Sequence, residues 1–141
     1  PIVQRKISFA ERWEHDQWVS ITSAYRASPY FEYYEDRLRP LFSEPKANLS
    51  EQNLATIEFT LNALNLNIPF RLTDKFYPSE HYEIDYRKAF SARNPSLPEW
   101  FEPVHYPQVF GEEFSPNLSV LDLMFNKGPA SELILKAGWK G

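Results

Sequence analysis

The stretch S-V-L-D-L-M-F-N-K-G-P, residues 119–129, decides the fold of this 141-residue chain. Its apolar residues fall on nearly every side of a helix, which indicates a buried central helix. Ser119 and Asp122 can cap the start of that helix. The final Gly-Pro pair ends it, because glycine tolerates a left-handed cap and proline cannot extend the helix. The rest of the chain must therefore cover this helix, and residues 129–136 can add a further short one.

Two helices are expected near the start of the chain. A Ser-x-x-Glu capping box at residues 8–11 predicts a helix over residues 9–25. A second helix starts near Pro29, which suits a first helical position because its missing amide hydrogen would be unpaired there anyway. We expect this helix to kink or stop near Arg37, because the ring of Pro40 clashes with the preceding turn.

A third helix is predicted over residues 48–65. Asn48 and Glu51 offer a capping pair, and apolar residues then recur at helical spacing. Short connections between these helices favour antiparallel packing of neighbours. The residues expected to form much of the core are Trp13, Trp18, Phe31, Tyr34, Leu54, Ile57, Leu61, Leu121 and Phe125.

The pattern changes after the third helix. Residues 68–72 are typical of a short strand, and residues 82–87 alternate with period 2, which favours a second extended segment. Four prolines from Pro95 to Pro107 exclude a long regular element and are typical of a loop that wraps the surface or builds a site. The predicted fold class is therefore mainly α, with antiparallel helices and one or two short strands, in a single domain over residues 1–141.

The composition excludes several classes of protein. The net charge is -4 and cysteine is absent. A nucleic-acid-binding protein usually carries a basic patch, whereas the longest basic cluster here is Arg5-Lys6. A chain without cysteine has no disulfide framework and fits a reducing compartment, so we expect a cytoplasmic protein. No apolar run approaches the roughly 20 residues of a spanning helix, so membrane insertion is not expected.

Familiar catalytic and cofactor motifs are missing from the sequence. It contains no G-x-S-x-G nucleophile elbow, no phosphate-binding loop and no dinucleotide fingerprint. The histidines at positions 15, 81 and 105 share no metal-ligand spacing, so surface or packing roles are the better interpretation. We therefore predict neither a metal nor a cofactor.

Asp85 and Arg87 form the first candidate group. As an exposed ion pair they would contribute little. On the rim of a cleft, Arg87 can hold a carboxylate or phosphate in bidentate fashion while Asp85 orients it or acts as a base. The residues alone leave both interpretations open.

Two further polar pairs are candidates for a site. Tyr106 and Gln108 offer a hydroxyl, an aromatic face and an amide, although both can simply anchor their loop. Asp122 and Asn126 lie one turn apart on the central helix and need buried partners. They either hold a neighbouring loop or face a site, and Asp122 can also serve only as part of the helix cap.

The C-terminal half carries a family resemblance. The stretch Y-P-Q-V-F-(x3)-F-S-P-N-L-S-V-L-D-L-M-F-N-K-G-P, from Tyr106 to Pro129, resembles the hallmark motif of the WbqC-like family. Residues 18–31, with Trp18, Ala24-Tyr25 and Ser-Pro-Tyr-Phe, are similar to an earlier family pattern. Asp85-Tyr86-Arg87 resembles the Asp-aromatic-Arg motif of some members.

This resemblance implies a transferase of surface-polysaccharide (O-antigen) biosynthesis, with transfer of a glycyl or related aminoacyl group to a sugar as the proposed activity. The implied partners are a sugar or nucleotide sugar and an aminoacyl donor, and a homodimer is a further expectation. Asp85 or Asp122 would be the general base, and Arg87 would bind an anionic group. The residues that would position substrate groups are Tyr106, Gln108 and Asn126.

The chain also departs from the family pattern. Members begin with a strand-rich stretch, and Pro1-Ile2 resembles the end of its last strand. The chain is therefore expected to correspond to the C-terminal portion of a WbqC-like protein, whose whole fold would be α+β. Two alternatives remain: an incomplete and inactive piece of the transferase, or a non-catalytic protein-interaction domain in a polysaccharide-assembly system. The interaction domain predicts an exposed aromatic patch built from Tyr30, Tyr33 and Trp100.

Overall fold

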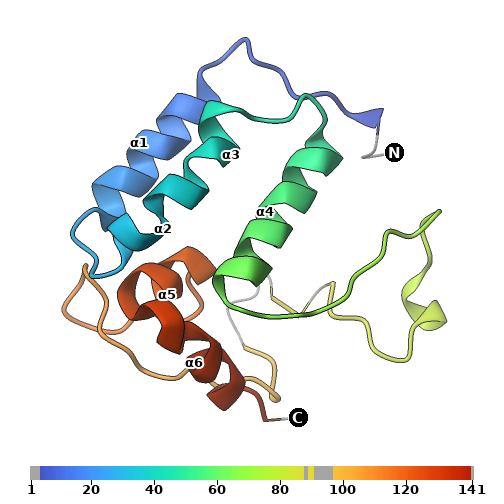
Figure 1. Cartoon of the computed structure of the whole chain (residues 1–141). Coiled ribbons are helices and arrows are strands. Elements are labelled where there is room, and N and C mark those ends of the chain that lie inside the picture. The colour runs from blue at the N-terminus through green and yellow to red at the C-terminus, as the bar shows by residue number, and fades with distance from the viewer. Residues whose placement is uncertain (1–3, 88, 91–96, 141) are drawn as a thin grey trace.

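The computed structural model describes residues 4–87, 89–90 and 97–140. Two antiparallel neighbours, α1 and the α2–α3 pair, lie beside α4, and α5 and α6 close one end of these helices (Figure 1). The prediction of a mainly α fold with antiparallel helices is confirmed. The helical elements are α1 (Trp13–Tyr25), α2 (Phe31–Leu38), α3 (Pro40–Ser43), α4 (Leu49–Ala63), η2 (Ser79–His81), α5 (Val120–Lys127), η3 (Gly128–Ala130) and α6 (Ser131–Ala137).

Helix α5 is the buried centre of the fold, as its sequence predicts. The side chains of Met124 and Phe125 are 0% exposed. The ring of Phe125 lies edge-on to Phe31 of α2, with centroids 5.2 Å apart. Tyr34 and Leu38, on the next turns of α2, complete this contact surface and are also buried. Burial of such side chains is the main stabilising contribution, at about 1.5–3 kcal/mol each.

Two of the predicted helix starts are confirmed, and a third is wrong. The Ser119 hydroxyl accepts a hydrogen bond from the Leu121 amide at the start of α5, and Asn48 caps α4. The capping box at residues 8–11 does not start α1, which begins at Trp13. Ser8 instead bonds locally to the Ala10 amide, a competing side-chain contact that serine often makes outside a helix.

The predicted break near Pro40 is confirmed. Helix α2 ends at Leu38, and Pro40 becomes the first residue of α3. Proline is tolerated there because the first turn of a helix has no partner for its missing amide hydrogen. The start predicted near Pro29 is two residues early, because Tyr30 is the N-cap of α2 and the helix begins at Phe31.

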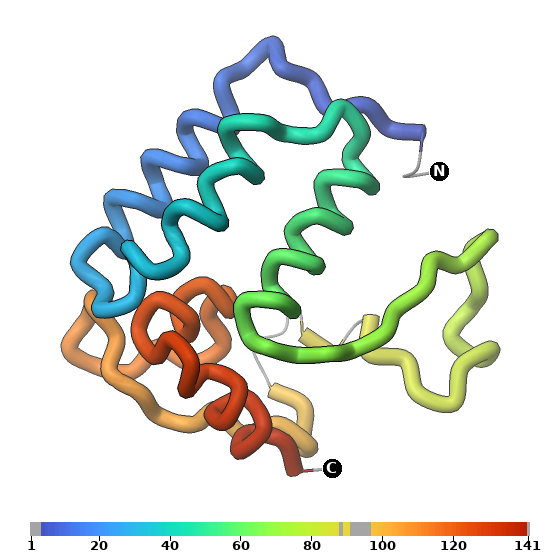
Figure 2. The backbone as a smooth tube through the Cα atoms, viewed as in Figure 1, coloured from blue at the N-terminus to red at the C-terminus, as the bar shows by residue number. Residues whose placement is uncertain are grey.

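The strands predicted at residues 68–72 and 82–87 are not formed. Within the described residues the β contacts are two isolated antiparallel bridges, Lys6 with Asn48 and Phe101 with Trp139. After α4, residues 65–87 leave the helices as a long segment, which we name the arm (Figure 2). A strand requires a neighbour that accepts and donates its backbone hydrogen bonds, and period-2 alternation alone supplies none. Ile68 is accordingly 55% exposed.

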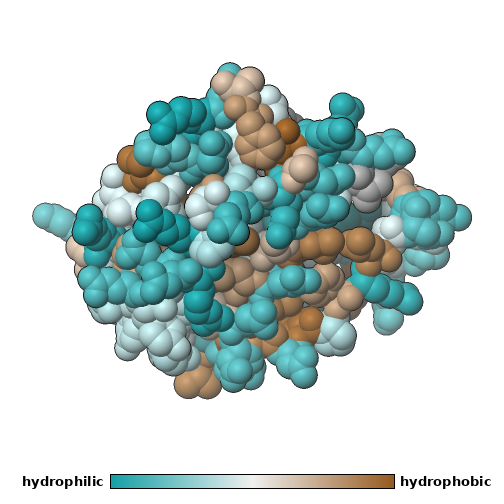
Figure 3. All heavy atoms as spheres, turned by 45° about the horizontal axis from the view of Figure 1, so that its top comes forward, coloured by the Kyte–Doolittle hydropathy of each residue, from teal (hydrophilic) through white to brown (hydrophobic). Residues whose placement is uncertain are grey.

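The predicted core is confirmed only in part. Phe31, Tyr34 and Phe125 belong to it, and Trp18 and Leu121 pack against it. The prediction fails on α4, where Ile57 is 46% exposed, and Trp13, Leu54 and Leu61 are half-buried. Figure 3 shows apolar side chains at the surface among hydrophilic ones. Pro1, Ile2 and Pro95 lie outside the described residues.

Candidate functional site

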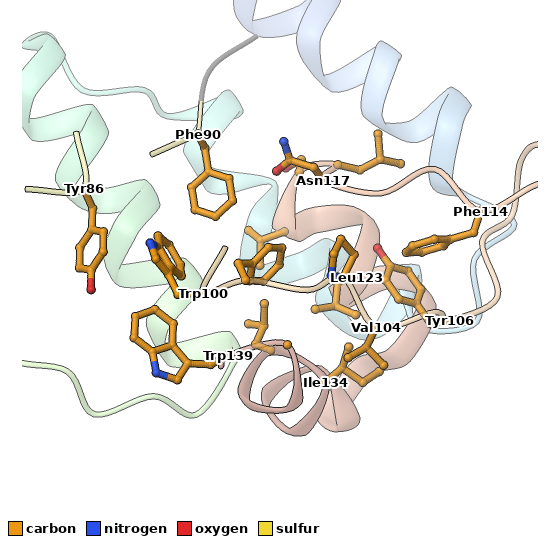
Figure 4. A pocket seen from close by; sticks show the side chains of 17 residues that line it. Tyr86, Phe90, Trp100, Val104, Tyr106, Phe114, Asn117, Leu123, Ile134 and Trp139 are labelled. Atoms are coloured by element: carbon orange, nitrogen blue, oxygen red, sulfur yellow. The ribbon is translucent and has the colours of Figure 1, made fainter. Parts of the chain in front are cut away.

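A cavity of about 520 Å³, here named the aromatic pocket, lies between the proline-rich loop and helices α5 and α6. Figure 4 shows the rings of Tyr86, Phe90, Trp100 and Trp139 gathered at one end of it. The Trp100 and Trp139 ring centroids are 4.8 Å apart, and Tyr86 lies edge-on to Trp100 at 5.0 Å. A volume of this size is typical of a small-molecule site.

The other end of the aromatic pocket is different in chemistry. Val104, Leu123 and Ile134 line its middle, and Tyr106 and Phe114 form its far wall (Figure 4). The pocket therefore runs from a cluster of aromatic rings, across aliphatic side chains, to a tyrosine that carries a hydroxyl.

Backbone pairing between the proline-rich loop and the C-terminal segment holds the tryptophans together. The Glu102 amide donates to the Gly138 carbonyl, and the Lys140 amide donates to the Trp100 carbonyl, each at 2.8 Å. Gly138 permits this approach, because a Cβ atom there would lie 2.8 Å from the Glu102 carbonyl oxygen. Trp100 and Trp139 are thus fixed side by side although they lie far apart in sequence.

Behind the tyrosine wall lies a buried carboxylate. Asp122 is 0% exposed. Its Oδ2 atom accepts hydrogen bonds from the Tyr106 hydroxyl at 2.7 Å and from Gln108 Nε2 at 2.9 Å. Its Oδ1 atom accepts from Asn126 Nδ2 at 3.2 Å. Three donors therefore compensate the cost of burying this group, and they form what we name the Asp122 network: Tyr106, Gln108, Asp122 and Asn126.

Gln108 and Asn126 are also bound to the backbone. Gln108 donates to the Ser115 carbonyl at 3.0 Å and accepts from the Ser115 amide at 2.9 Å, which closes the loop between them. Asn126 donates to the backbone carbonyl of Asp122 at 2.8 Å. Both side chains therefore hold the carboxylate and its surroundings in place. Tyr106 is the member of the network that also lines the aromatic pocket.

Two tyrosines near Asp122 have raised pKa values. Burial, and then the hydrogen bond to Asp122, raises the pKa of Tyr106 above its ordinary value. Burial and the negative charge of Asp122 raise the pKa of Tyr25 to about 12. Both hydroxyls therefore stay protonated well above neutral pH, and the Tyr106 hydroxyl donates its hydrogen to Asp122.

Asp85 and Arg87 bind each other on the arm, and among the described residues neither side chain is hydrogen-bonded to the Asp122 network. Arg87 Nε and Nη2 donate to the Asp85 carboxylate at 2.8 and 2.6 Å, and Nη1 donates to the Tyr77 carbonyl at 3.0 Å. The guanidinium carbon also lies 5.3 Å from the Phe76 ring centre and 5.1 Å from that of Tyr82. These hydrogen bonds hold the pKa of Asp85 well below its usual range. In this structure, the pair therefore holds the segment near Tyr77 against residues 85–87 of the arm.

The structure thus divides the predicted site residues into two groups. Tyr106, Gln108, Asp122 and Asn126 come together, whereas Asp85 and Arg87 bind each other elsewhere. Of all six, Tyr106 is the one that lines the aromatic pocket.

Sequence reasoning missed the aromatic end of the pocket. The available signals were the 16% aromatic content and the proline-rich loop around Trp100. Of the residues predicted to form an exposed aromatic patch, Tyr30 and Tyr33 are exposed, whereas Trp100 is half-buried and packs against Trp139.

Among the described residues, no three His, Cys, Asp or Glu side chains are grouped closely enough to hold a metal ion. The helices in the described part of the chain include none with the length and apolar character needed to cross a bilayer.

Comparison with protein families places this geometry in context. The profile of the WbqC-like protein family matches residues 1–94 and 84–133. The chain belongs to the WbqC-like protein family. The second match contains the whole Asp122 network and Tyr86, whereas Trp139 lies beyond the matched residues. No curated protein and no solved structure matches this WbqC-like chain.

Proposed function

We propose that this WbqC-like chain is a transferase of surface-polysaccharide biosynthesis that binds a sugar in the aromatic pocket. One observation carries the proposal: the pocket joins a cluster of aromatic rings at one end to Tyr106, bound to the buried Asp122, at the other. The aromatic cluster would bind a ring-shaped ligand, and the Tyr106–Asp122 pair would accept a proton.

The aromatic end suits a sugar for a physical reason. One face of a pyranose ring carries mostly C–H groups and is apolar, while its edge carries hydroxyls. Flat aromatic side chains bury such a face, and the neighbouring solvent hydrates the hydroxyls. Trp139 is half-exposed, so its ring can contact a ligand and leave the ligand's edge in water.

The Asp122 network suits group transfer to a sugar hydroxyl or amine. The sugar nucleophile would attack the carbonyl carbon of an activated aminoacyl ester or thioester, forming the new acyl bond. Its proton would pass to the Tyr106 oxygen as the Tyr106 proton passes to Asp122 Oδ2, and the leaving group would depart with the electron pair of the broken bond. Asp122 would then act through Tyr106, and Gln108 and Asn126 would orient the carboxylate.

Asp85 is the weaker candidate for the base. Arg87 holds its carboxylate through several hydrogen bonds and lowers its pKa, and both effects reduce its tendency to take a proton. Arg87 would bind an anionic group of a substrate only by exchanging part of its contact with Asp85.

We place the reaction in the cytoplasm, in keeping with the absence of cysteine.

The test is calorimetric binding of nucleotide sugars and of simple methyl glycosides to the full chain. Trp139→Ala should weaken binding roughly tenfold or more, since it removes an aromatic anchor. Trp13→Ala is the matched control, because Trp13 lies on α1 and does not line the pocket. Equal weakening by both variants, or no binding of any sugar, would contradict the proposal.

The catalytic part needs a separate measurement. Tyr106→Phe should leave sugar affinity nearly unchanged and reduce aminoacyl transfer roughly 100-fold, the usual scale for loss of a general acid or base. Unchanged transfer in this variant would remove the Tyr106–Asp122 pair from the reaction.

A second candidate is a non-catalytic interaction domain. The observation that favours it is the row of exposed apolar side chains on the arm, from Ile68 to Phe76, the last of which is 81% exposed. Such surface is typical of a protein contact. If this is the main role, the chain should self-associate in sedimentation experiments, and the double variant Phe70→Ser with Phe76→Ser should abolish this self-association. Neither the original chain nor the variant should then bind a sugar.

A further inference from the structure

We propose that the aromatic pocket selects a sugar that carries a short acylamino substituent, such as an acetamido group. This inference deepens the proposed function and rests on it. It depends on the order of chemical surfaces along the pocket, from aromatic rings to aliphatic side chains (Figure 4).

The aliphatic middle of the pocket determines which substituent fits. Val104, Leu123 and Ile134 present neither donors nor acceptors. A hydroxyl placed against them would lose its water and gain no partner, and an ammonium group would lose still more. A methyl group loses nothing there and buries apolar surface. A sugar whose ring lies on the tryptophans must therefore extend an apolar group toward Leu123.

A polar side chain, that of Asn117, lies at the edge of the pocket. Asn117 lines the pocket between its two ends, and its side-chain amide has no hydrogen-bond partner among the described residues. An amide side chain offers both donors and an acceptor. An acylamino group needs both, because its N–H donates and its carbonyl accepts. A plain methyl substituent would leave Asn117 unused.

The backbone at Asn117 is consistent with a fixed position. Its φ angle is +58°, in the left-handed region that non-glycine residues occupy rarely and asparagine more often than most. The next residues lead directly into the Ser119 cap of α5. The side chain is therefore carried on backbone that the start of the central helix holds in place.

The test compares three matched ligands on the full chain by calorimetry: the methyl glycosides of glucose, glucosamine and N-acetylglucosamine. The N-acetyl compound should bind roughly tenfold or more tightly than the other two, the scale set by one small apolar group in a matching pocket. Val104→Thr and Asn117→Ala should each shrink that preference. Val19→Thr is the control, because Val19 lies exposed on α1 and away from the pocket.

The outcomes separate this inference from the function on which it rests. Equal affinity for all three glycosides, with weakening by Trp139→Ala, would overturn the acylamino preference and leave the sugar site standing. Absence of binding by all three would overturn both. A preference for the N-acetyl compound that Val104→Thr and Asn117→Ala leave unchanged would show that another surface reads the substituent, and would overturn the inference.

Discussion

The hydroxyl of Tyr106 donates a 2.7 Å hydrogen bond to Oδ2 of Asp122, sixteen residues later in the chain. This contact joins a wall of the aromatic pocket to the buried central helix α5. The loop that carries Tyr106 has no regular secondary structure of its own, so side-chain contacts with α5 must fix its position.

Tyr106→Phe should lower the free energy of unfolding by about 1.5–3 kcal/mol, the usual contribution of a hydrogen bond to a charged group. Urea denaturation measures this change. Tyr33→Phe is the control, because Tyr33 is 61% exposed, and it should change stability by less than about 0.5 kcal/mol. Similar values for both variants would show that the Tyr106–Asp122 contact is not a structural tie.

The raised tyrosine pKa values predict a loss of stability at alkaline pH. In the folded chain the pKa of Tyr25 is about 12, compared with an ordinary value of 10.0. Between these values the Tyr25 hydroxyl loses its proton in the unfolded chain and keeps it in the folded chain. The contribution of Tyr25 to the free energy of unfolding is therefore fully present below pH 10 and falls as the pH rises toward 12. Denaturation series across this range should show a shallower fall for Tyr25→Phe. Identical slopes would mean that Tyr25 is not the group involved.

Arg87 gives a prediction that separates a structural from a binding role. Arg87→Ala should speed amide hydrogen exchange in residues 76–87, because it removes the bonds to Asp85 and to the Tyr77 carbonyl. It should leave the affinity for uncharged glycosides unchanged. Arg87→Lys should not restore protection, since an ammonium group cannot reproduce the two-point contact. Unaltered exchange together with lost nucleotide-sugar binding would assign Arg87 to a substrate instead.

Gly128 ends α5 at a position that only glycine fits. Its φ of +53° and ψ of -127° lie in a region closed to other residues, and an added Cβ would lie 2.4 Å from the Tyr30 ring. Gly128→Ala should therefore cost more than Gly111→Ala, where φ is +82° but the nearest contact is 3.4 Å away. The difference, on the order of 1–3 kcal/mol, should shrink in a Tyr30→Ala background. An equal cost at both glycines would refute the Tyr30 contact.

Local sequence patterns predicted the helical part of the fold well. The central helix, its Ser119 cap and its Gly128 stop are all determined by residues within one or two turns of each other. The break at Pro40 is equally local, because it follows from the shape of one ring. The failed strands at 68–72 and 82–87 show the limit, since a strand also requires a partner elsewhere in the chain.

The candidate site shows the same limit. The sequence motif pointed to Tyr106, Gln108 and Asp122, which do meet, because the central helix and the loop before it are close in sequence. The meeting of Trp100 with Trp139 depends on backbone pairing across almost forty positions, and no local pattern indicates it. The ion pair of Asp85 with Arg87 is local and is one of the two interpretations that the sequence leaves open, whereas the contact of Arg87 with the Tyr77 carbonyl follows from the path of the arm.

A sugar bound in the aromatic pocket would lie against two of the four tryptophans of the chain, so the tryptophan signals report on its binding directly. Trp100 and Trp139 line the pocket, whereas Trp13 and Trp18 lie on α1. The measurement is the shift of the four indole N–H signals in the nuclear magnetic resonance spectrum as methyl N-acetylglucosaminide is added to the labelled chain. We predict saturable shifts of the Trp100 and Trp139 signals and none of the other two. Shifts confined to Trp13 and Trp18, or no shift at any signal, would show that no sugar binds in the aromatic pocket.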